Sequence, residues 1–491
     1  MSPAATGAAP GRRAPRGAAR TRDEVLDVPF GAGRSGEAPL TWGQRAIWHA
    51  IGRTAPNDHY FNLGRVLPLA DRGVPVDTER LCTAIGSLMS RHEALRTRVV
   101  DTGGEPAQQL HAAGRVELVV RDEPDPEQAG RTAAGLLAEL SGRRFGYARE
   151  WPVRLGAVRS DGRITHAVLA LCHLAADGHA AEVLERDLRL LVRRGQAGPA
   201  CAQTPLDLAR HQHGPAGRRT SEASLAHWER GLALVPPTMF AQRAAEPLRP
   251  RFWTGRLVSA ALPRAVDAVA SAHGVSGSTV LLTAAAALVA AGQGHRAAAV
   301  MPIAGNRAAE GQRTLVSTLS QDALFVLELP EDPSGKAVFT DVLAGAWPAA
   351  LAGYRAAAYD PVAWDALLER AARERGTEVH PYCCFNDMRL VDRAAAAVPA
   401  PCVQELAELR RRTVLDFPAT QERVACRYCL HLTGDAAELT VTLTADTAYL
   451  PPDAIHAHLR GIEEVVVASA AGAPPPLSGL AGLLAGPEAG R

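Results

Sequence analysis

A strand that is apolar on both faces and ends in a histidine constrains the fold of this chain more than any other feature. Residues 164–173 read ITHAVLALCH, with apolar side chains at both odd and even positions. Because successive side chains of a strand point to opposite faces, this run predicts a strand covered on both sides. The loop LAADG (174–178) follows, and HAAEVLERDLRLLVRRG (179–195) has the apolar spacing of an amphipathic helix. The unit predicts a layered α/β domain.

The same alternation of helical and extended patterns runs through the rest of the chain. In the first half, VRLGAVRSDGRITHAVLALCH (153–173) predicts a hairpin that turns at Ser-Asp-Gly-Arg. Further helices are expected at 40–52, 77–95 and 131–145, and strands at 96–100 and 116–122. In the second half we expect helices at 221–233, two within 261–292, 336–355 and 452–470, and strands at 295–307, 321–330, 381–390, around 426–434 and 437–446.

The length and composition divide the chain into two lobes. A chain of 491 residues exceeds what one compact core usually holds. The stretch from about 195 to 250 is rich in Pro, Gly and Arg, which favours a boundary there. We therefore expect a first lobe at 37–205 and a second at 206–470. Residues 1–36, rich in Ala, Gly, Pro and Arg, predict a disordered extension, and residues 471–491 a flexible tail.

Charge and hydropathy exclude several classes of function. The net charge is +1 and the arginines lie among acids, which disfavours nucleic-acid binding. The longest apolar stretch, residues 275–294, is rich in Ala and broken by Gly and Ser, so we expect a buried helix and no membrane span. The basic start lacks the apolar run of a secretory signal, and we expect a cytoplasmic protein.

The cysteines and a histidine pair give no metal signature. Eight cysteines in so long a chain do not form a disulfide framework. Cys426 and Cys429 have the spacing of a redox or zinc pair, but no second pair exists and the segment predicts a strand. We expect ordinary buried thiols in a reducing cytoplasm. His211 and His213 have no acidic or thiol companions, so no metal site is expected.

The residues that close the buried strand can support proton transfer. A histidine at the end of a rigid strand can face a cleft, and its ordinary pKa leaves a neutral imidazole available to accept a proton. Asp177 lies four residues after His173, across a turn, where it can orient the ring or pair with an arginine. Gly178 offers a backbone N–H and permits a turn barred to other residues. On these residues alone, a polar core histidine explains His173 better than a catalytic one.

Further motifs give the chain a resemblance to a known family. It resembles the condensation domains of nonribosomal peptide synthetases, which belong with the chloramphenicol-acetyltransferase-like acyltransferases, from about Leu40 to about Ala470. The resemblance implies an α/β (α+β) fold of two such lobes in a V-shaped pseudo-dimer, with the active site at their junction and a tunnel open at both ends. The motifs that carry it are LTWGQRAIWHAI (40–51), RHEALRTRVV (91–100), CHLAADG (172–178), TPLDLARHQ (204–212), AHWERGLA (226–233), VMPIAGNR (300–307) and STLSQDALFVLEL (317–329).

The family pattern His-His-x-x-x-Asp-Gly assigns roles at the junction. His173 matches the second histidine and would act as general base or position the nucleophile. Cys172 replaces the first histidine, and strand alternation predicts that it faces the core, where a small apolar thiol suffices. An altered or less active site stays open as a second interpretation. Asp177 would pair with Arg307 and brace the two lobes, and Gly178 would offer its N–H to the thioester oxygen.

Two further positions follow from the resemblance alone. Arg96, in RHEALRTR, would stabilise the first lobe, and Asn386, in CCFND, would place a polar group toward the site. For both Arg307 and Asn386 the alternative is an ordinary structural role, as a surface ion pair and a turn residue.

The resemblance implies a free-standing condensation enzyme. An acyl thioester on the phosphopantetheine arm of a separate carrier protein would be the donor, and a small amine or alcohol the acceptor, giving an amide or an ester. No metal or redox cofactor is expected to bind. Two alternatives stay open: a related acyltransferase that uses acyl-CoA, and a catalytically degenerate module that recruits carrier proteins or oxygenases. An epimerase relative fits the RHEALRTR motif less well.

Overall fold

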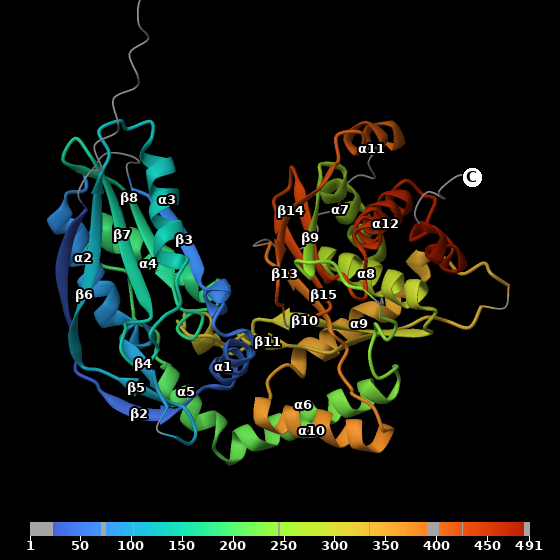
Figure 1. Ribbon diagram of the computed structural model, residues 1–491, viewed down its shortest axis with the longest axis horizontal. Coiled ribbons are helices and arrows are strands. Elements are labelled where there is room, and N and C mark those ends of the chain that lie inside the picture. Colours follow the sequence, from blue (N-terminus) through green and yellow to red (C-terminus); the bar gives the residue numbers. More distant parts are fainter. Residues whose placement is uncertain are drawn as a thin grey trace, which may run out of the picture.

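The two halves of the chain form two lobes joined along one edge. The computed structural model describes residues 23–69, 75–101, 103–243, 246–332, 334–389, 402–424 and 426–485. Each lobe is built on its own β-sheet, and the chain passes from one to the other through α5 (Pro205–Gln212) and α6 (Pro215–Ala233) (Figure 1). Because this passage lies at 205–233, the expected boundary near residue 205 falls at the start of the connection.

The first lobe contains a five-stranded sheet in the order β1-β6-β7-β8-β3, and β2, β5 and β4 form a smaller sheet beside it. The helices α2 and α4 pack on one face of the larger sheet and α3 on the other. The strands are β1 (Glu24–Gly31), β2 (Gly36–Pro39), β3 (Leu63–Pro68), β4 (Thr97–Val100), β5 (Ala107–Leu110), β6 (Ala113–Asp122), β7 (Val153–Ser160) and β8 (Arg163–Leu171), and the helices are α1 (Trp42–Thr54), α2 (Thr78–Arg91), α3 (Ala129–Ser141) and α4 (Gly178–Arg194).

Strand β8 has the buried environment that its sequence predicts. It pairs antiparallel with β7 on one side and β3 on the other. The turn between β7 and β8 consists of Asp161 and Gly162, both with positive φ (50° and 74°), as a tight hairpin turn requires. Val168 and Ala170 pack against α3, while Leu169 and Leu171 pack against α2 and α4. The strand therefore ends rigidly at the point where His173 follows.

The second lobe contains a larger mixed sheet in the order β11-β10-β13-β15-β16-β9-β14, with β12 also paired to β10. Its strands are β9 (Phe252–Ser259), β10 (Ala297–Ala304), β11 (Gln321–Asp322), β12 (Phe325–Glu328), β13 (Cys383–Asp387), β14 (Val414–Gln421), β15 (Tyr428–Gly434) and β16 (Leu439–Asp446). The helices are α7 (Ala261–His273), α8 (Gly277–Gln293), α9 (Leu343–Arg355), α10 (Pro361–Arg375), α11 (Val403–Arg410) and α12 (Pro452–Ala470).

The two faces of the second sheet differ. Tyr428, Leu430 and Leu432 alternate along β15 and are buried in the core formed with α7, α8 and α12. Figure 1 shows these three helices on the side of the sheet away from the first lobe. Asn386 and His431 are only half-buried and stand opposite each other on neighbouring strands. Because side chains alternate along strands, the face toward the first lobe is the more polar one.

The structure corrects both predicted terminal boundaries. Residues 24–31, expected within a disordered extension of residues 1–36, form β1 and pair with β6 along its length. Val28 and Phe30 are buried, and the composition on which the prediction rested is that of the residues before this strand. The tail expected to be flexible from 471 contains a 3₁₀ helix, Leu477–Leu483, whose Leu480 is fully buried. Residues 1–22 and 486–491 lie outside the described residues.

Other elements also depart from the sequence prediction. The strands β9 and β14 and the helix α10 were not predicted. The single strand expected at 321–330 is divided into β11 and β12, and the connection holds two helices instead of one short helix. Within the described residues no single helix has the length and hydropathy to cross a membrane, although α7 and α8 together, bent by 100° at their junction, meet that test.

Candidate active site at the junction of the lobes

His173 lies in the turn after β8, where the first lobe meets the second. Its backbone carbonyl accepts a hydrogen bond from Oγ1 of Thr318, a residue of the second lobe. The imidazole makes an edge contact with Phe61, with ring centroids 6.4 Å apart. Burial lowers the pKa of His173, so the neutral imidazole dominates at neutral pH.

The two nitrogens of His173 have different surroundings. Nδ1 is buried, and no described group has the geometry of a hydrogen bond to it. The residue as a whole is half-buried, which leaves Nε2 as the nitrogen that a bound molecule can reach. In a neutral ring that carries its hydrogen on Nδ1, Nε2 is the acceptor and can take a proton from a molecule that reaches it. The geometry therefore favours a chemical role over a packing role.

Asp177 forms the ion pair with Arg307 that the resemblance implied. The two guanidinium nitrogens lie 2.8 and 2.9 Å from the two carboxylate oxygens, and both side chains are buried. Arg307 comes from the loop after β10, so the pair connects the two lobes. Asp177 also accepts from the backbone N–H groups of Leu319 (3.0 Å) and Ser320 (3.2 Å) of the second lobe, and caps α4 through Ala180 N–H (2.9 Å).

The carboxylate of Asp177 thus has a structural role and does not orient the ring of His173. Every hydrogen bond found for the side chain of Asp177 goes to Arg307 or to a backbone N–H within the described chain. Arg307 in turn donates to the carbonyl oxygens of Gly305, Leu315 and Ser317. A buried ion pair satisfied in this way holds the junction in one arrangement.

Gly178 is the first residue of α4 and follows His173 by five positions. Its backbone N–H has no hydrogen-bond acceptor among the described residues. This N–H lies at the positive end of the helix dipole. The expectation that Gly178 adopts a turn barred to other residues is wrong, because its φ is not in the positive region and an added Cβ would contact nothing within 4 Å. Its backbone N–H, and not its conformation, is what it offers the site.

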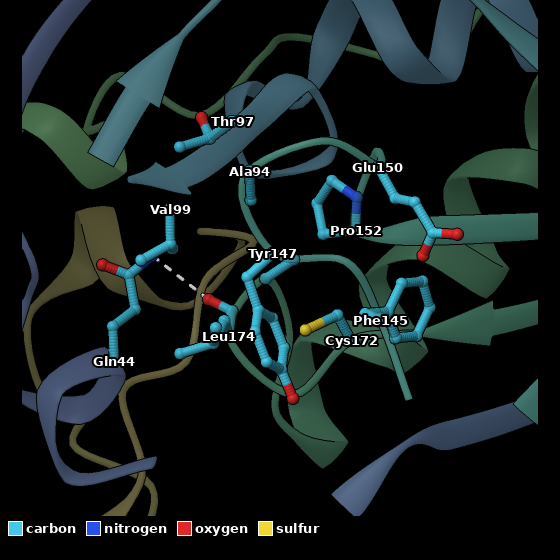
Figure 2. Close-up of a pocket in the computed structure, with 11 residues that line it drawn as sticks. Gln44, Ala94, Thr97, Val99, Phe145, Tyr147, Glu150, Pro152, Cys172 and Leu174 are labelled. Carbon is cyan, nitrogen blue, oxygen red and sulfur yellow. Dashed lines mark hydrogen bonds between the residues drawn. The ribbon is translucent and has the colours of Figure 1, made fainter. Parts of the chain in front are cut away.

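Cys172 points into the first lobe, as strand alternation predicts. It is buried in a small apolar cluster with Val99, Phe145 and Leu174, and burial raises the pKa of its thiol to about 12. Figure 2 shows Cys172 beside Phe145 and Tyr147. These side chains line a cavity of about 10 Å³. That volume holds about one water molecule and no substrate. The thiol therefore fills space behind the site.

Arg96 and Asn386 take positions of different kinds. Arg96 is buried in the first lobe and donates to the carbonyl oxygens of Arg34 (2.8 Å) and His111 (2.6 Å), a structural position. Asn386 lies on β13, half-buried on the polar face of the second sheet, opposite His431. It is not a turn residue, and Arg307 is not a surface residue.

The expectation of ordinary thiols is wrong for two cysteines. Cys384 and Cys426 form a disulfide across 42 residues, and the Sγ atom of Cys429 lies beside them. The pairing of Cys426 with a residue on another strand could not be read from local spacing. His211 is exposed, and Nε2 of His213 lies 3.0 Å from the carbonyl oxygen of Leu40.

Sequence reasoning missed two residues that hold His173 in place. Thr318 bonds the His173 carbonyl from the other lobe, and Phe61 lies against its ring. Thr318 belongs to the STLSQDAL motif, which signalled the family but gave no role to this hydroxyl. Phe61 lies on a short 3₁₀ helix, Asp58–Phe61, which has no sequence signature.

Comparison with known proteins identifies the family of the chain. The family model described as Condensation domain matches residues 34–318, more than half of the chain. This match includes the His173 turn and the Asp177 position, together with the loop that carries Arg307.

The curated relatives are larger proteins. The chain is 29% identical over 380 residues to the probable non-canonical nonribosomal peptide synthetase CymA of Salinispora arenicola (strain CNS-205), covering 72% of this chain and 5% of that protein. It is 28% identical over 395 residues to the isonitrile lipopeptide synthase of Mycobacterium tuberculosis (strain ATCC 25618 / H37Rv), covering 76% of this chain and 15% of that protein. The chain thus spans only a small part of the length of these relatives.

Solved structures share the fold at low sequence identity. The condensation domain of the monacolin K polyketide synthase MokA superposes with a TM-score of 0.70 at 15% identity, covering 91% of this chain and 100% of that one. SgcC5 from Streptomyces globisporus gives 0.65 at 19%, covering 89% and 100%. The X-domain from teicoplanin biosynthesis gives 0.64 at 19%, covering 91% and 98%. With the family match and these folds together, the chain belongs to the condensation domain family.

Proposed function

We propose that the chain joins an acyl group, delivered as a thioester on a carrier protein, to an amine or hydroxyl acceptor, and that His173 assists the nucleophile. One observation carries this proposal: the half-buried imidazole of His173 lies at the junction of two lobes that an ion pair holds together. Membership of a family found in nonribosomal peptide synthetases supports it.

The reaction follows from the state of the imidazole. A neutral amine attacks the thioester carbonyl carbon, and as the new C–N bond forms its nitrogen becomes acidic. Nε2 of His173 can accept that proton, because burial favours the neutral ring. The C–S bond then breaks, and the departing thiolate takes the proton from the imidazolium. With a hydroxyl acceptor the same transfers give an ester.

The start of α4 provides stabilisation for the charge that develops on the carbonyl oxygen. The N–H of Gly178 has no acceptor within the described residues, and the helix dipole adds positive potential there. Asp177 caps the same helix and is neutralised by Arg307, so its charge does not oppose an oxyanion as an unpaired carboxylate would. The ion pair between Asp177 and Arg307 therefore supports the reaction because it fixes the position of α4 relative to His173.

Two series of assays test the proposal. In the first, the protein is incubated with acyl groups loaded on carrier proteins or on coenzyme A, each with a panel of amines and alcohols, and products are identified by mass spectrometry. We expect product with carrier-bound donors. Product with acyl-CoA alone would assign the chain to the CoA-dependent acyltransferases instead.

In the second series, donor and acceptor classes are exchanged separately. Amide product shows an amine acceptor, and ester product a hydroxyl acceptor. If no donor and acceptor pair gives product while the protein still binds carrier proteins, the chain is a recruiting module, as the replacement of the first histidine by Cys172 allows. That result would overturn the proposed catalytic function.

A further inference from the structure

Three cysteines converge on the second sheet, on the face that is turned toward the first lobe. Cys384 on β13 and Cys429 on β15 are partners in the parallel ladder, and Cys426 lies just before β15. Their Sγ atoms all lie within 4.8 Å of one another. Among the residues that the structure describes, no other group of three His, Cys, Asp or Glu side chains brings its ligand atoms so close together.

The surroundings of these sulfur atoms suit a bound cation. Cys426 and Cys429 are each 9% exposed, whereas Cys384 is half-buried and gives access from solvent. Cys383 and Phe385, the neighbours of Cys384 in sequence, point to the opposite face and pack in the core. The ladder thus fixes two of the three donors at adjacent positions of one sheet, so little ordering is required to bring the donors together.

We propose that Cys384, Cys426 and Cys429, when reduced, bind one thiophilic divalent cation of the zinc class. Thiolate donors select soft or borderline cations such as Zn²⁺ over Mg²⁺ or Ca²⁺, which prefer oxygen. With Zn–S bonds of about 2.3 Å, two thiolates of a tetrahedral site lie roughly 3.8 Å apart. Cys429 Sγ, within 4.8 Å of both other sulfur atoms, needs only a small movement, and the Sγ atoms of Cys384 and Cys426 move apart once the bond between them is reduced. A water molecule or a substrate atom would complete the tetrahedron.

The disulfide between Cys384 and Cys426 defines when the site exists. Oxidised sulfur atoms of a disulfide are not thiolate ligands, so the cation requires reduction first. Two molecules of a low-molecular-weight thiol supply the two electrons and two protons, giving two cysteine thiols and one small-molecule disulfide. Binding of the cation then releases one proton from each of the three thiols. Oxidation and metal binding therefore compete for the same atoms.

The first test uses Co²⁺ as a spectroscopic substitute for Zn²⁺. The full chain is reduced with a phosphine without oxygen, freed of excess reductant and titrated with Co²⁺. We expect one equivalent to bind with a thiolate-to-cobalt charge-transfer band in the near ultraviolet and the visible bands of a tetrahedral centre, and Zn²⁺ to remove both. Absence of the charge-transfer band in the reduced chain would overturn the proposal.

Serine variants assign the band to these residues. In Cys384→Ser, Cys426→Ser and Cys429→Ser we expect Co²⁺ binding at least about tenfold weaker with a smaller charge-transfer band, since one thiolate is lost. Cys402→Ser is the matched control, because Cys402 is exposed and lies outside the cluster. An unchanged band in all three cluster variants, or an equal loss in the control, would contradict the assignment.

A second measurement needs no variant and so does not depend on folding. The reduced wild-type chain is alkylated with and without Zn²⁺, and the modified cysteines are identified by mass spectrometry. We expect Zn²⁺ to protect Cys384, Cys426 and Cys429 together and to leave Cys402 as reactive as before. Equal alkylation of the three cysteines with and without Zn²⁺ would overturn the proposal.

Discussion

The buried pair of Asp177 and Arg307 makes the strongest prediction about stability. Arg307→Ala removes both guanidinium bonds to the carboxylate, at 2.8 and 2.9 Å, and leaves that carboxylate buried. It also removes the donors to three carbonyl oxygens of the same loop region. Breaking a buried pair in this way generally costs about 3–5 kcal/mol of unfolding free energy, because one charge stays behind without its partner.

The remaining contacts of Asp177 set the expected magnitude. The carboxylate keeps three backbone N–H donors, from Ala180, Leu319 and Ser320, so the cost should lie near the lower end of that range, about 3 kcal/mol. For a lobe of this size, 1 kcal/mol corresponds to roughly 2–4 °C in melting temperature. We therefore expect Arg307→Ala to lower the melting temperature by about 6–12 °C.

Calorimetry or thermal circular dichroism measures this shift, with two companion variants. Arg307→Lys keeps the charge but loses the bidentate geometry, so an intermediate decrease is expected. Arg370→Ala is the control, since Arg370 pairs with Glu229 at 3.0 Å between two exposed side chains, and its loss should cost less than about 1 kcal/mol. If the melting temperature of Arg307→Ala equals that of the wild type, or is no lower than that of Arg370→Ala, the ion pair between Asp177 and Arg307 does not stabilise the junction.

Three further predictions concern the site. With a hydroxyl acceptor, which does not titrate in this range, kcat/KM should be constant near neutral pH and decrease only below pH 6.5. The reason is that burial lowers the pKa of His173 and the neutral ring is the active form. A decrease in kcat/KM centred above pH 7 would contradict this prediction. Cys172→Ala should cost about 1 kcal/mol in a denaturant titration and leave turnover within about twofold, because the thiol only fills space behind the site; a loss of activity without a loss of stability would show a direct role. Thr318→Val should lower kcat by about tenfold with KM unchanged. The hydrogen bond that positions the His173 carbonyl is lost, and a tenfold decrease corresponds to about 1.4 kcal/mol in the activation free energy. Steady-state kinetics equal to those of the wild type would show that Thr318 does not contribute to the site.

Much of the first lobe could be predicted because its patterns are local. The run 164–173, the Asp161-Gly162 turn and the helix after Asp177 each follow from side-chain periodicity and turn chemistry, and all are present. Strand β1 was missed because it was grouped with the Ala-, Gly-, Pro- and Arg-rich residues that precede it, although Leu26, Val28 and Phe30 alternate as in a strand. Pairing with β6 and the burial of Val28 and Phe30 decide its structure, and neither is visible in a local window.

The residues of the candidate site likewise fall into those that the sequence could predict and those that it could not. His173, Asp177 and Gly178 lie within six residues, so one motif pointed to them, and the pairing with Arg307 followed only from the family resemblance. The bond from Thr318, the ring of Phe61 and the three cysteines of the second sheet depend on contacts between distant segments. A single sequence carries no signal for such contacts, which is why these residues emerged only from the structure.

Replacement of His173 tests the central claim most directly. Wild type and His173→Ala are compared with the same carrier-bound donor and acceptor, with product measured by mass spectrometry and folding by thermal melting. Because the ring has no hydrogen-bond partner at Nδ1 within the described residues, its removal should leave the melting temperature nearly unchanged. Product formation should fall by about 10²–10⁴-fold, the usual contribution of a general base. Wild-type turnover in the folded variant would contradict the assignment of His173 to catalysis.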